Sequence, residues 1–176
     1  MGGNAGALSK SNLRGVDLLI LVTLGTNDKA FVRLLEEVDK LIEEGIITDE
    51  VVVQAGFTKY HSPNMKILDL VPILELEDLT HRCDLLITHG GVGSIITGLK
   101  NGKKVIAVPR LAQYKEHVNN HQLEIIENFH QSGYLIGIGG TEELKSALLQ
   151  VKNFSPKPYQ SNTENMLALV KKCIEE

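Results

Sequence analysis

The sequence predicts an α/β fold in which a Rossmann-like parallel sheet carries helices on both faces. Short, continuous apolar runs such as residues 18–24 and 105–108 alternate with segments whose apolar residues recur at helical spacing. Strands of a parallel sheet are buried on both faces and have such runs, whereas the covering helices are apolar on one side only. The alternation continues without a long linker, which favours strand–helix–strand units in a single sheet.

The N-terminal half is expected to contain strands at residues 18–24, 51–53 and 66–71. The helix between the first two has an apolar stripe made of Phe31, Leu34, Leu35, Val38, Leu41 and Ile42. Asn27 or Asp28 is suited to cap the start of this helix, and Gly45 to end it. Pro72 ends the third strand because proline lacks an N–H donor, and a short helix should follow.

The C-terminal half is expected to add strands at residues 85–88, 105–108 and 134–138, and helices at 116–131 and 142–151. A further helix runs from Val92 to Asn101-Gly102, a suitable helix stop. The last helix carries Leu167, Val170 and Ile174 on one side, which indicates either a core contact or a surface for a partner.

The composition predicts one domain at residues 17–176, preceded by a flexible leader or artificial extension at 1–16 that is rich in Gly, Ser and Asn. A net charge of -4 argues against broad nucleic-acid binding, which needs a basic surface. Cys83 and Cys173 form no metal spacing and indicate reduced thiols of a cytosolic protein. Because no apolar run approaches about 18 residues, direct transmembrane insertion is not expected.

Ligands of parallel sheets bind beyond the carboxyl ends of the strands, which directs attention to the loops at residues 25–28, 89–94 and 109–122. The second loop is Thr88-His-Gly-Gly-Val-Gly-Ser94, which joins a strand to a helix. Its glycines let backbone amides approach an anion, and the helix dipole adds roughly half a positive charge. A diphosphate site is therefore predicted. The alternative is a tight turn whose glycines serve only packing.

Two better-known phosphate loops do not fit this segment. A P-loop requires Gly, four residues and then Gly-Lys-Ser/Thr, a run that the chain lacks. The dinucleotide fingerprint G-x-G-x-x-G fails at Ile96, and the segment is not at the first strand.

The segment Thr88–Ser94 resembles the diphosphate loop of GT-B glycosyltransferases, including the Thr-His-Cys-Gly-x-Asn-Ser box of plant small-molecule enzymes. Residues 105–109, followed by Glu116-His-Val-Asn-Asn-His-Gln122, keep the order and approximate spacing of that family. The start Val22-Thr-Leu-Gly-Thr26 and the triplet Asn120-His-Gln122 are similar to the small, family 28 C-terminal-domain-like subunits of two-chain transferases. These include the eukaryotic enzyme that extends dolichol-linked chitobiose and bacterial enzymes of capsule and exopolysaccharide synthesis.

The resemblance implies the fold of the C-terminal, donor-binding half of a GT-B enzyme, with a role for each matched residue. The donor diphosphate would contact Gly25, Thr26, His89, Gly90, Gly91, Gly93 and Ser94. The donor sugar or ribose would contact Glu116, His117, Asn120 and Gln122. The backbone at Leu70 and Val71 would read the uracil edge.

The resemblance also implies an activity: transfer of a sugar from a UDP-sugar to a lipid-linked saccharide, with inversion at the anomeric carbon. A membrane-anchored partner chain would bring the acceptor site and could supply the general base, so no catalytic residue is assigned in this chain. The protein would be cytoplasmic and peripheral to the membrane through that partner. Because the chain has no Asp-x-Asp motif, no metal and no cofactor are expected.

Several alternatives stay open. Glu116 could open a helix, where the dipole favours a carboxylate; Thr26 could satisfy a turn; Asn120 and Gln122 could face outward. His117 and His121 are four apart, but Val118 stands where H-E-x-x-H needs glutamate, so a zinc pair is not expected. For the whole protein, one alternative is a UDP-N-acetylglucosamine isomerase. Such an enzyme would need a second domain in the same chain, and a length of 176 residues argues against this. A non-catalytic subunit that binds nucleotide sugars or stabilises a partner is the other alternative.

Overall fold

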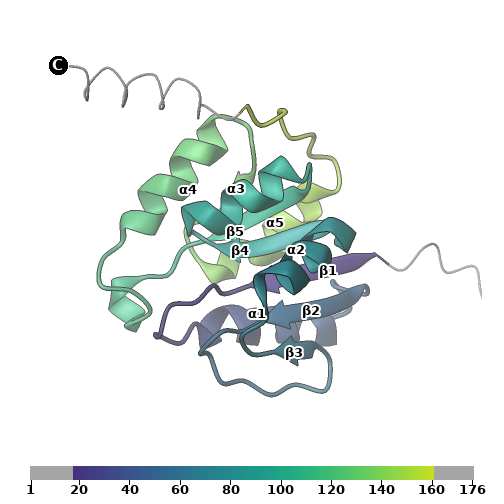
Figure 1. Cartoon of the computed structure of the whole chain (residues 1–176), viewed down its shortest axis with the longest axis vertical. Coiled ribbons are helices and arrows are strands. Elements are labelled where there is room, and N and C mark those ends of the chain that lie inside the picture. Colours follow the sequence, from purple (N-terminus) through teal and green to yellow (C-terminus); the bar gives the residue numbers. More distant parts are fainter. Residues whose placement is uncertain (1–17, 161–176) are drawn as a thin grey trace, which may run out of the picture.

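A computed structural model describes residues 18–160, which form a six-stranded sheet between two layers of helices (Figure 1). The strand order is β3-β2-β1-β4-β5-β6, and every neighbouring pair is parallel. The strands are β1 (Leu19–Thr23), β2 (Glu50–Gln54), β3 (Lys66–Leu68), β4 (Leu85–His89), β5 (Lys104–Val108) and β6 (Ile136–Gly137). The parallel, helix-covered sheet predicted from the sequence is confirmed.

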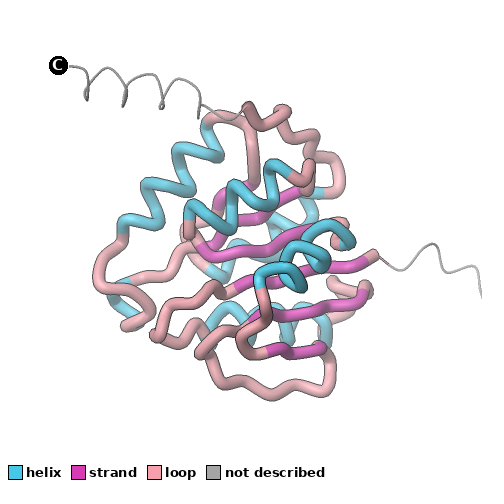
Figure 2. Tube along the Cα trace, in the orientation of Figure 1, coloured by secondary structure: helices cyan, strands magenta, loops and turns pink. Residues whose placement is uncertain are grey.

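Helices cover both faces of the sheet, as Figure 2 shows. One face packs on α1 (Val32–Glu43) and α5 (Leu144–Val151), which follows the 3-10 turn η2 (Thr141–Glu143). The other face packs on α2 (Ile73–Arg82), α3 (Val92–Lys100) and α4 (His121–Gln131).

Strand β1 shows why the apolar runs are continuous. Ile20 and Val22 belong to the core cluster beneath α1 and α5, whereas Leu21 belongs to the cluster beneath α2, α3 and α4. All three side chains are buried. A strand with helices on both faces needs apolar residues at successive positions, because side chains alternate between the faces.

The strand order reverses between β1 and β4. The chain leaves β1 toward β2 on one side and leaves β4 toward β5 on the other, so the loops after these two strands diverge. A crevice for a ligand is expected at such a switch point, beyond the carboxyl ends of the strands. The fold therefore brings the loop after Thr23 beside the glycine loop after His89.

Five predicted elements have different boundaries in the structure. The helix expected at 116–131 begins only at His121, after a loop with a 3-10 turn, η1 (Ala112–Tyr114), and a left-handed residue, Lys115 (φ 60°). Helix α1 begins at Val32, so neither Asn27 nor Asp28 caps it; Oδ1 of Asn27 accepts the Lys29 amide instead. The strands expected at 66–71 and 134–138 are shorter, and 142–151 begins with η2.

The remaining expectations concern the two ends of the chain, membrane spans and the cysteines. The leader at 1–16 and the last helix at 167–174 lie outside the described residues. No helix within residues 18–160 has the length and apolar character needed to cross a membrane. Cys83 is buried, and burial raises the pKa of its thiol to about 11, so this thiol is unreactive.

Candidate functional site

The glycine loop presents free backbone amides at the start of α3. Strand β4 ends at His89, Gly91 is the N-cap residue and the helix starts at Val92. Among residues 18–160, no hydrogen bond engages the amides of Gly91, Val92, Gly93 or Ser94. The first amides of a helix lack intrahelical acceptors, and the helix dipole makes their position favourable for an anion. This arrangement is suited to a phosphate group.

The surface at the start of α3 is open on the side of Gly93. Gly93 is exposed, and a Cβ atom added to it would meet no atom within 4 Å. Beside it lies a groove of about 260 Å³ between α2 and α3. The groove is lined by Thr23, Ile73, Leu76, Glu77, Thr80, Leu86, Gly93, Ser94 and Thr97. An anion held by the amides would therefore have room for an attached organic group.

The Gly90 amide, in contrast, is engaged within the protein. It donates to Oε1 of Gln122 at 3.0 Å, and the same oxygen accepts the amide of Arg110 at 2.9 Å. Gln122 is only 7% exposed, so the alternative that it faces outward is wrong. Of the three glycines in the loop after β4, Gly90 is thus the one whose N–H is already used.

His89 occupies the centre of the site and explains two of the glycines. A Cβ atom on Gly25 would lie 2.5 Å from Cε1 of His89, and one on Gly91 would collide with Nε2. The ring is therefore held between two residues that must lack side chains. A side chain at Gly25 or Gly91 would therefore clash with this ring, whereas Gly93 has no neighbour within 4 Å that requires it to be glycine.

The His89 ring is neutral at physiological pH. Burial and, to a lesser extent, the nearby Arg110 guanidinium lower its pKa to about 4. Nδ1 lies 3.4 Å from the carbonyl oxygen of Thr23. Because a carbonyl only accepts hydrogen bonds, Nδ1 carries the proton in this arrangement and Nε2 has the lone pair.

This lowered pKa predicts acid destabilisation. Between about pH 6.5 and pH 4 the unfolded chain binds a proton at His89 that the folded chain does not, so the folded state loses stability as the pH falls. We expect a loss of about 2 kcal/mol between about pH 7 and pH 4.5, measured by urea unfolding. His89→Gln should remove most of this dependence, whereas His61→Gln, at an exposed position, should keep it. Equal slopes for all three proteins would contradict the assignment.

The loop after β1 is held by Gln54, a residue that the sequence analysis did not single out. Gly25 has a positive φ of 74°. Its amide donates to Oε1 of Gln54 at 3.2 Å, and its carbonyl accepts from Nε2 at 3.1 Å. The neighbouring Thr26 is exposed, and no hydrogen bond within the described range uses its hydroxyl. Of Gly25 and Thr26, the two residues of this loop assigned to the diphosphate, Thr26 is the one that remains available to a ligand.

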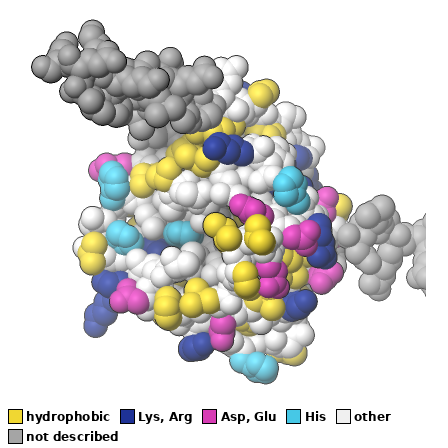
Figure 3. All heavy atoms as spheres, in the orientation of Figure 1, with side chains coloured by type: hydrophobic (Ala, Val, Ile, Leu, Met, Phe, Trp, Pro, Cys, Tyr) yellow, Lys and Arg dark blue, Asp and Glu magenta, His cyan; other side chains and the backbone are white. Residues whose placement is uncertain are grey.

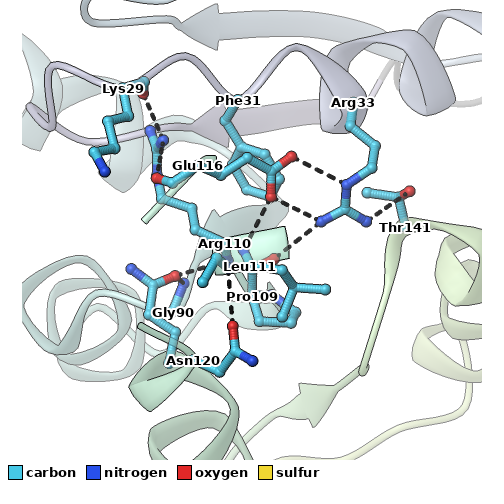
Figure 4. Close-up of polar contacts among 12 residues, drawn as sticks. Lys29, Phe31, Arg33, Gly90, Pro109, Arg110, Leu111, Glu116, Asn120 and Thr141 are labelled. Carbon is cyan, nitrogen blue, oxygen red and sulfur yellow. Dashed lines mark hydrogen bonds and ion pairs between the residues drawn. The ribbon is translucent and has the colours of Figure 1, made fainter. Parts of the chain in front are cut away.

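The carboxylate of Glu116 is buried and fully occupied (Figure 4). Both oxygens bind Arg33, through Nε and Nη2 at 3.0 Å each, and Oε2 also accepts the amide of Leu111 at 3.0 Å. The residue is 4% exposed and lies in the loop before α4, so the alternative that it opens a helix is wrong. The donor-binding role assigned to Glu116 would require this carboxylate to exchange Arg33 for sugar hydroxyls.

Arg110 is a buried cation in the loops beyond the carboxyl ends of the strands, which form the rim of the site (Figure 4). It is 1% exposed and donates to the carbonyl oxygens of Lys29 (2.6 Å), Leu24 (2.7 Å) and Glu116 (3.4 Å). Burial lowers its pKa to about 10, so the side chain is still charged near neutral pH. It ties both ends of the Gly25 loop to the loop after β5.

The other residues assigned to the donor lie around this framework. Asn120 is exposed, and its Oδ1 accepts the amide of Ala112 at 2.8 Å. His117 lies before α4 and its Nδ1 accepts the amide of Asn119 at 3.3 Å, so His117 and His121 do not share a helix. Within residues 18–160, no group of three or more His, Cys, Asp or Glu side chains is placed to hold a metal ion.

The two residues assigned to the uracil edge lie on the α2 side of the site. Leu70 and Val71 form the turn between β3 and α2, and Leu70 is 53% exposed. The adjoining Ile73 and Leu74 are 73% and 75% exposed. Figure 3 shows hydrophobic side chains gathered near the centre of the face that carries α2. The turn thus offers an apolar surface next to the groove beside Gly93.

The fold and the rim define a Rossmann-like domain of the kind that forms one half of GT-B glycosyltransferases. Among solved structures, the glycosyltransferase of kitacinnamycin is similar with a TM-score of 0.57 and 20% identity, over 86% of this chain and 38% of that chain. The Methanocaldococcus jannaschii UDP-GlcNAc 2-epimerase, solved with UDP-GlcNAc and UDP, gives 0.61 and 18%, over 89% and 46%. This chain therefore spans less than half of either protein, and what they share with it is the fold.

Residues 19–176 match the model of the glycosyltransferase family 28 C-terminal domain, and the chain belongs to this family. The UDP-N-acetylglucosamine transferase subunit ALG13 of Yarrowia lipolytica is 31% identical over 140 residues, which are 72% of this chain and 68% of that protein. The ALG13 subunit of Kluyveromyces lactis is 29% identical, over 76% of this chain and 86% of that protein.

Proposed function

We propose that this chain is the donor-binding subunit of a two-chain glycosyltransferase that moves a sugar from a UDP-sugar to a lipid-linked saccharide. The observation that carries the proposal is the set of unpaired amides from Gly91 to Ser94, which faces open space at the switch point of the sheet. Membership of the family and the names of the relatives favour UDP-N-acetylglucosamine as the donor.

The amides and the hydroxyl of Ser94 would act on the leaving group. As an acceptor hydroxyl oxygen bonds to the anomeric carbon, the bond from that carbon to the diphosphate oxygen breaks and negative charge grows on the leaving UDP. Donors that are already oriented stabilise such charge without reorganising during the reaction. The proton of the acceptor would pass to a base on the partner chain, and the anomeric carbon would be inverted.

The remaining parts of the proposal concern the surroundings of this site. Thr26 would close over the phosphates, His117 and Asn120 would line the sugar end, and the turn at Leu70 and Val71 would contact the uracil. A membrane-anchored partner would present the acceptor, so that this chain works at the cytoplasmic surface of a membrane. Because the chain lacks an Asp-x-Asp motif, we propose transfer without a metal, and activity should then persist in EDTA.

The proposal predicts selective binding of uridine nucleotides. Calorimetric titration with UDP-, GDP- and dTDP-sugars should give measurable affinity for the UDP-sugars alone, and Ser94→Ala should weaken it by about tenfold, as expected for one hydrogen bond to a charged group. Ser132→Ala is the matched control, because Ser132 lies at the C-terminal end of α4, away from the glycine loop, and its hydroxyl donates to the carbonyl of Asn128. Equal affinity for all three nucleotides, or none for any, would contradict the proposal.

A non-catalytic role is the second candidate, and it is favoured by the buried, occupied carboxylate of Glu116. The two roles differ in a reconstituted system. Sugar transfer by this chain together with its partner, and slow or no transfer by the chain alone, would support the catalytic subunit. Robust turnover by the single chain would contradict the need for a partner.

A further inference from the structure

We propose that Gln122 is a positioning residue whose side-chain oxygen orders the glycine loop (residues 89–94). The inference rests on the proposed function, since it concerns how the site for UDP is held in shape. It adds a second role to the one that the resemblance assigns to Gln122, and it is based on the contacts of Oε1.

Gln122 joins two strand ends that the backbone does not join. The register of β4 and β5 ends at the pair His89 and Val108. Just beyond this point, Oε1 of Gln122 accepts the amides of Gly90 and Arg110 at 3.0 and 2.9 Å. The side chain thus bridges the two strand ends through two hydrogen bonds.

The contact with Gly90 is close and leaves little freedom. A Cβ atom on Gly90 would lie 2.6 Å from Cβ of Gln122 and 3.0 Å from Oε1. Holding the Gly90 amide in this direction fixes the peptide groups that follow it, whose amides are the free ones at the start of α3. A catalytic or binding constellation depends on such supporting contacts for its precision.

The same oxygen of Gln122 links the glycine loop to the opposite side of the crevice. The Arg110 amide that it accepts belongs to the residue whose guanidinium donates to the carbonyls of Leu24 and Lys29. Three loops of the rim are therefore connected through Gln122 and Arg110. Loss of the Gln122 oxygen should loosen the diphosphate part of the site, whatever group is attached to the diphosphate.

This consequence separates a positioning residue from a residue that only contacts the sugar. If Gln122 orders the loop, Gln122→Met should weaken the binding of UDP, which lacks the donor sugar, by about tenfold. If Gln122 only contacts the sugar, the variant should weaken the binding of UDP-N-acetylglucosamine and leave the affinity for UDP unchanged. Gln131→Met is the matched control, because Gln131 is an exposed residue of the same helix whose Nε2 donates to Glu127. This control should bind both ligands as the natural chain does.

A second variant keeps the test decisive if Gln122→Met folds poorly. Gln122→Glu retains an oxygen acceptor and loses the NH₂ donor. It should keep the contact with the Gly90 amide, so the protection of this amide should match that of the natural chain. Loss of this protection in Gln122→Glu, or unchanged UDP affinity in folded Gln122→Met, would overturn the proposal.

Amide hydrogen exchange tests the same contact without a ligand. The Gly90 amide should be protected in the natural chain and in Gln122→Glu, and should lose protection in Gln122→Met. An unprotected Gly90 amide in the natural chain would overturn the positioning role. Failure of the natural chain to bind either nucleotide would overturn the proposed function instead, and the exchange data would still report on Gln122.

Discussion

Arg110→Met is expected to lower the free energy of unfolding by about 4 kcal/mol. The guanidinium donates to three backbone carbonyls, two of them at 2.6 and 2.7 Å. Methionine fills a similar volume but leaves these acceptors without their donor, and each buried, unpaired group costs about 1–3 kcal/mol. The contact of the cation with the ring of Phe31, 5.0 Å from its centroid, is lost as well.

One effect opposes this loss. A buried cation has a desolvation cost, which is visible in the lowered pKa of Arg110, and the Nε atom is buried without a hydrogen-bond partner. Methionine removes both penalties. We nevertheless expect the loss to dominate, because the carbonyls of Leu24 and Lys29 belong to a loop that is buried against the cation. Glu116 is not left unpaired in this variant, because its carboxylate keeps Arg33.

Urea unfolding at neutral pH measures the effect. Arg82→Met is the control: Arg82 forms an exposed ion pair with Asp78, with side chains 64% and 63% exposed, and such pairs contribute less than about 1 kcal/mol. Arg110→Lys should be intermediate, since one ammonium group replaces a fork that spans two carbonyls. Equal stability of Arg110→Met and Arg82→Met would show that the buried cation does not hold the rim together.

The sequence was sufficient for the parallel sheet because its signal is local and repeated. The runs at β1, β4 and β5 are apolar at successive positions, and only strands covered on both faces require this. The position of the glycine loop followed from the same pattern, since it comes directly after the run at β4. The general rule for parallel sheets then placed the site at the carboxyl ends.

The framework of the site was missed because its contacts are distant in sequence. Arg110 binds the carbonyls of Lys29 and Leu24, which precede it by 81 and 86 positions. Gln54, at the end of β2, binds Gly25, which follows the neighbouring strand β1 and precedes Gln54 by 29 positions. One local signal was present for both residues. Each is a polar residue at or just after the carboxyl end of a buried strand, where the sheet rule already placed the site.

The start of α4 was missed for a related reason. The expected helix was started at Glu116, although residues 117–120 (His-Val-Asn-Asn) are weak helix formers. The carboxylate of Glu116 instead binds Arg33 and the Leu111 amide, which holds residues 111–120 as a loop with Lys115 in a left-handed conformation. Distant contacts and weak local propensity therefore act in the same direction.

The three glycines of the glycine loop differ in their contacts with the rest of the protein, and this difference makes a sharp test possible. Gly90 is held by Gln122, and Gly91 leaves room for the ring of His89. A substitution at either position would disturb the fold and confuse any binding measurement. Gly93 alone of the three faces open space, so a side chain there changes the ligand site and leaves the packing intact.

Gly93→Asp is therefore expected to abolish UDP binding without loss of stability. Gly93 is the second residue of α3, where the helix dipole favours a carboxylate and where any residue with a Cβ restricts the unfolded chain more than glycine does. The folded state should be as stable as that of the natural chain, or more stable by up to about 1 kcal/mol. The same carboxylate would occupy the space in front of the free amides.

The expected loss of affinity follows from the charges. Two like charges about 5 Å apart repel by about 3 kcal/mol at an effective dielectric constant of about 20, which corresponds to a loss of at least roughly 100-fold for a doubly charged diphosphate. Gly93→Asn has the same shape without the charge and should lose much less affinity, so the difference between the two variants isolates the electrostatic part. Calorimetric titration with UDP, beside thermal unfolding of both variants, gives the comparison. If Gly93→Asp folds and binds UDP as tightly as Gly93→Asn does, the diphosphate does not lie at the start of α3, and the donor site must be sought elsewhere on the rim.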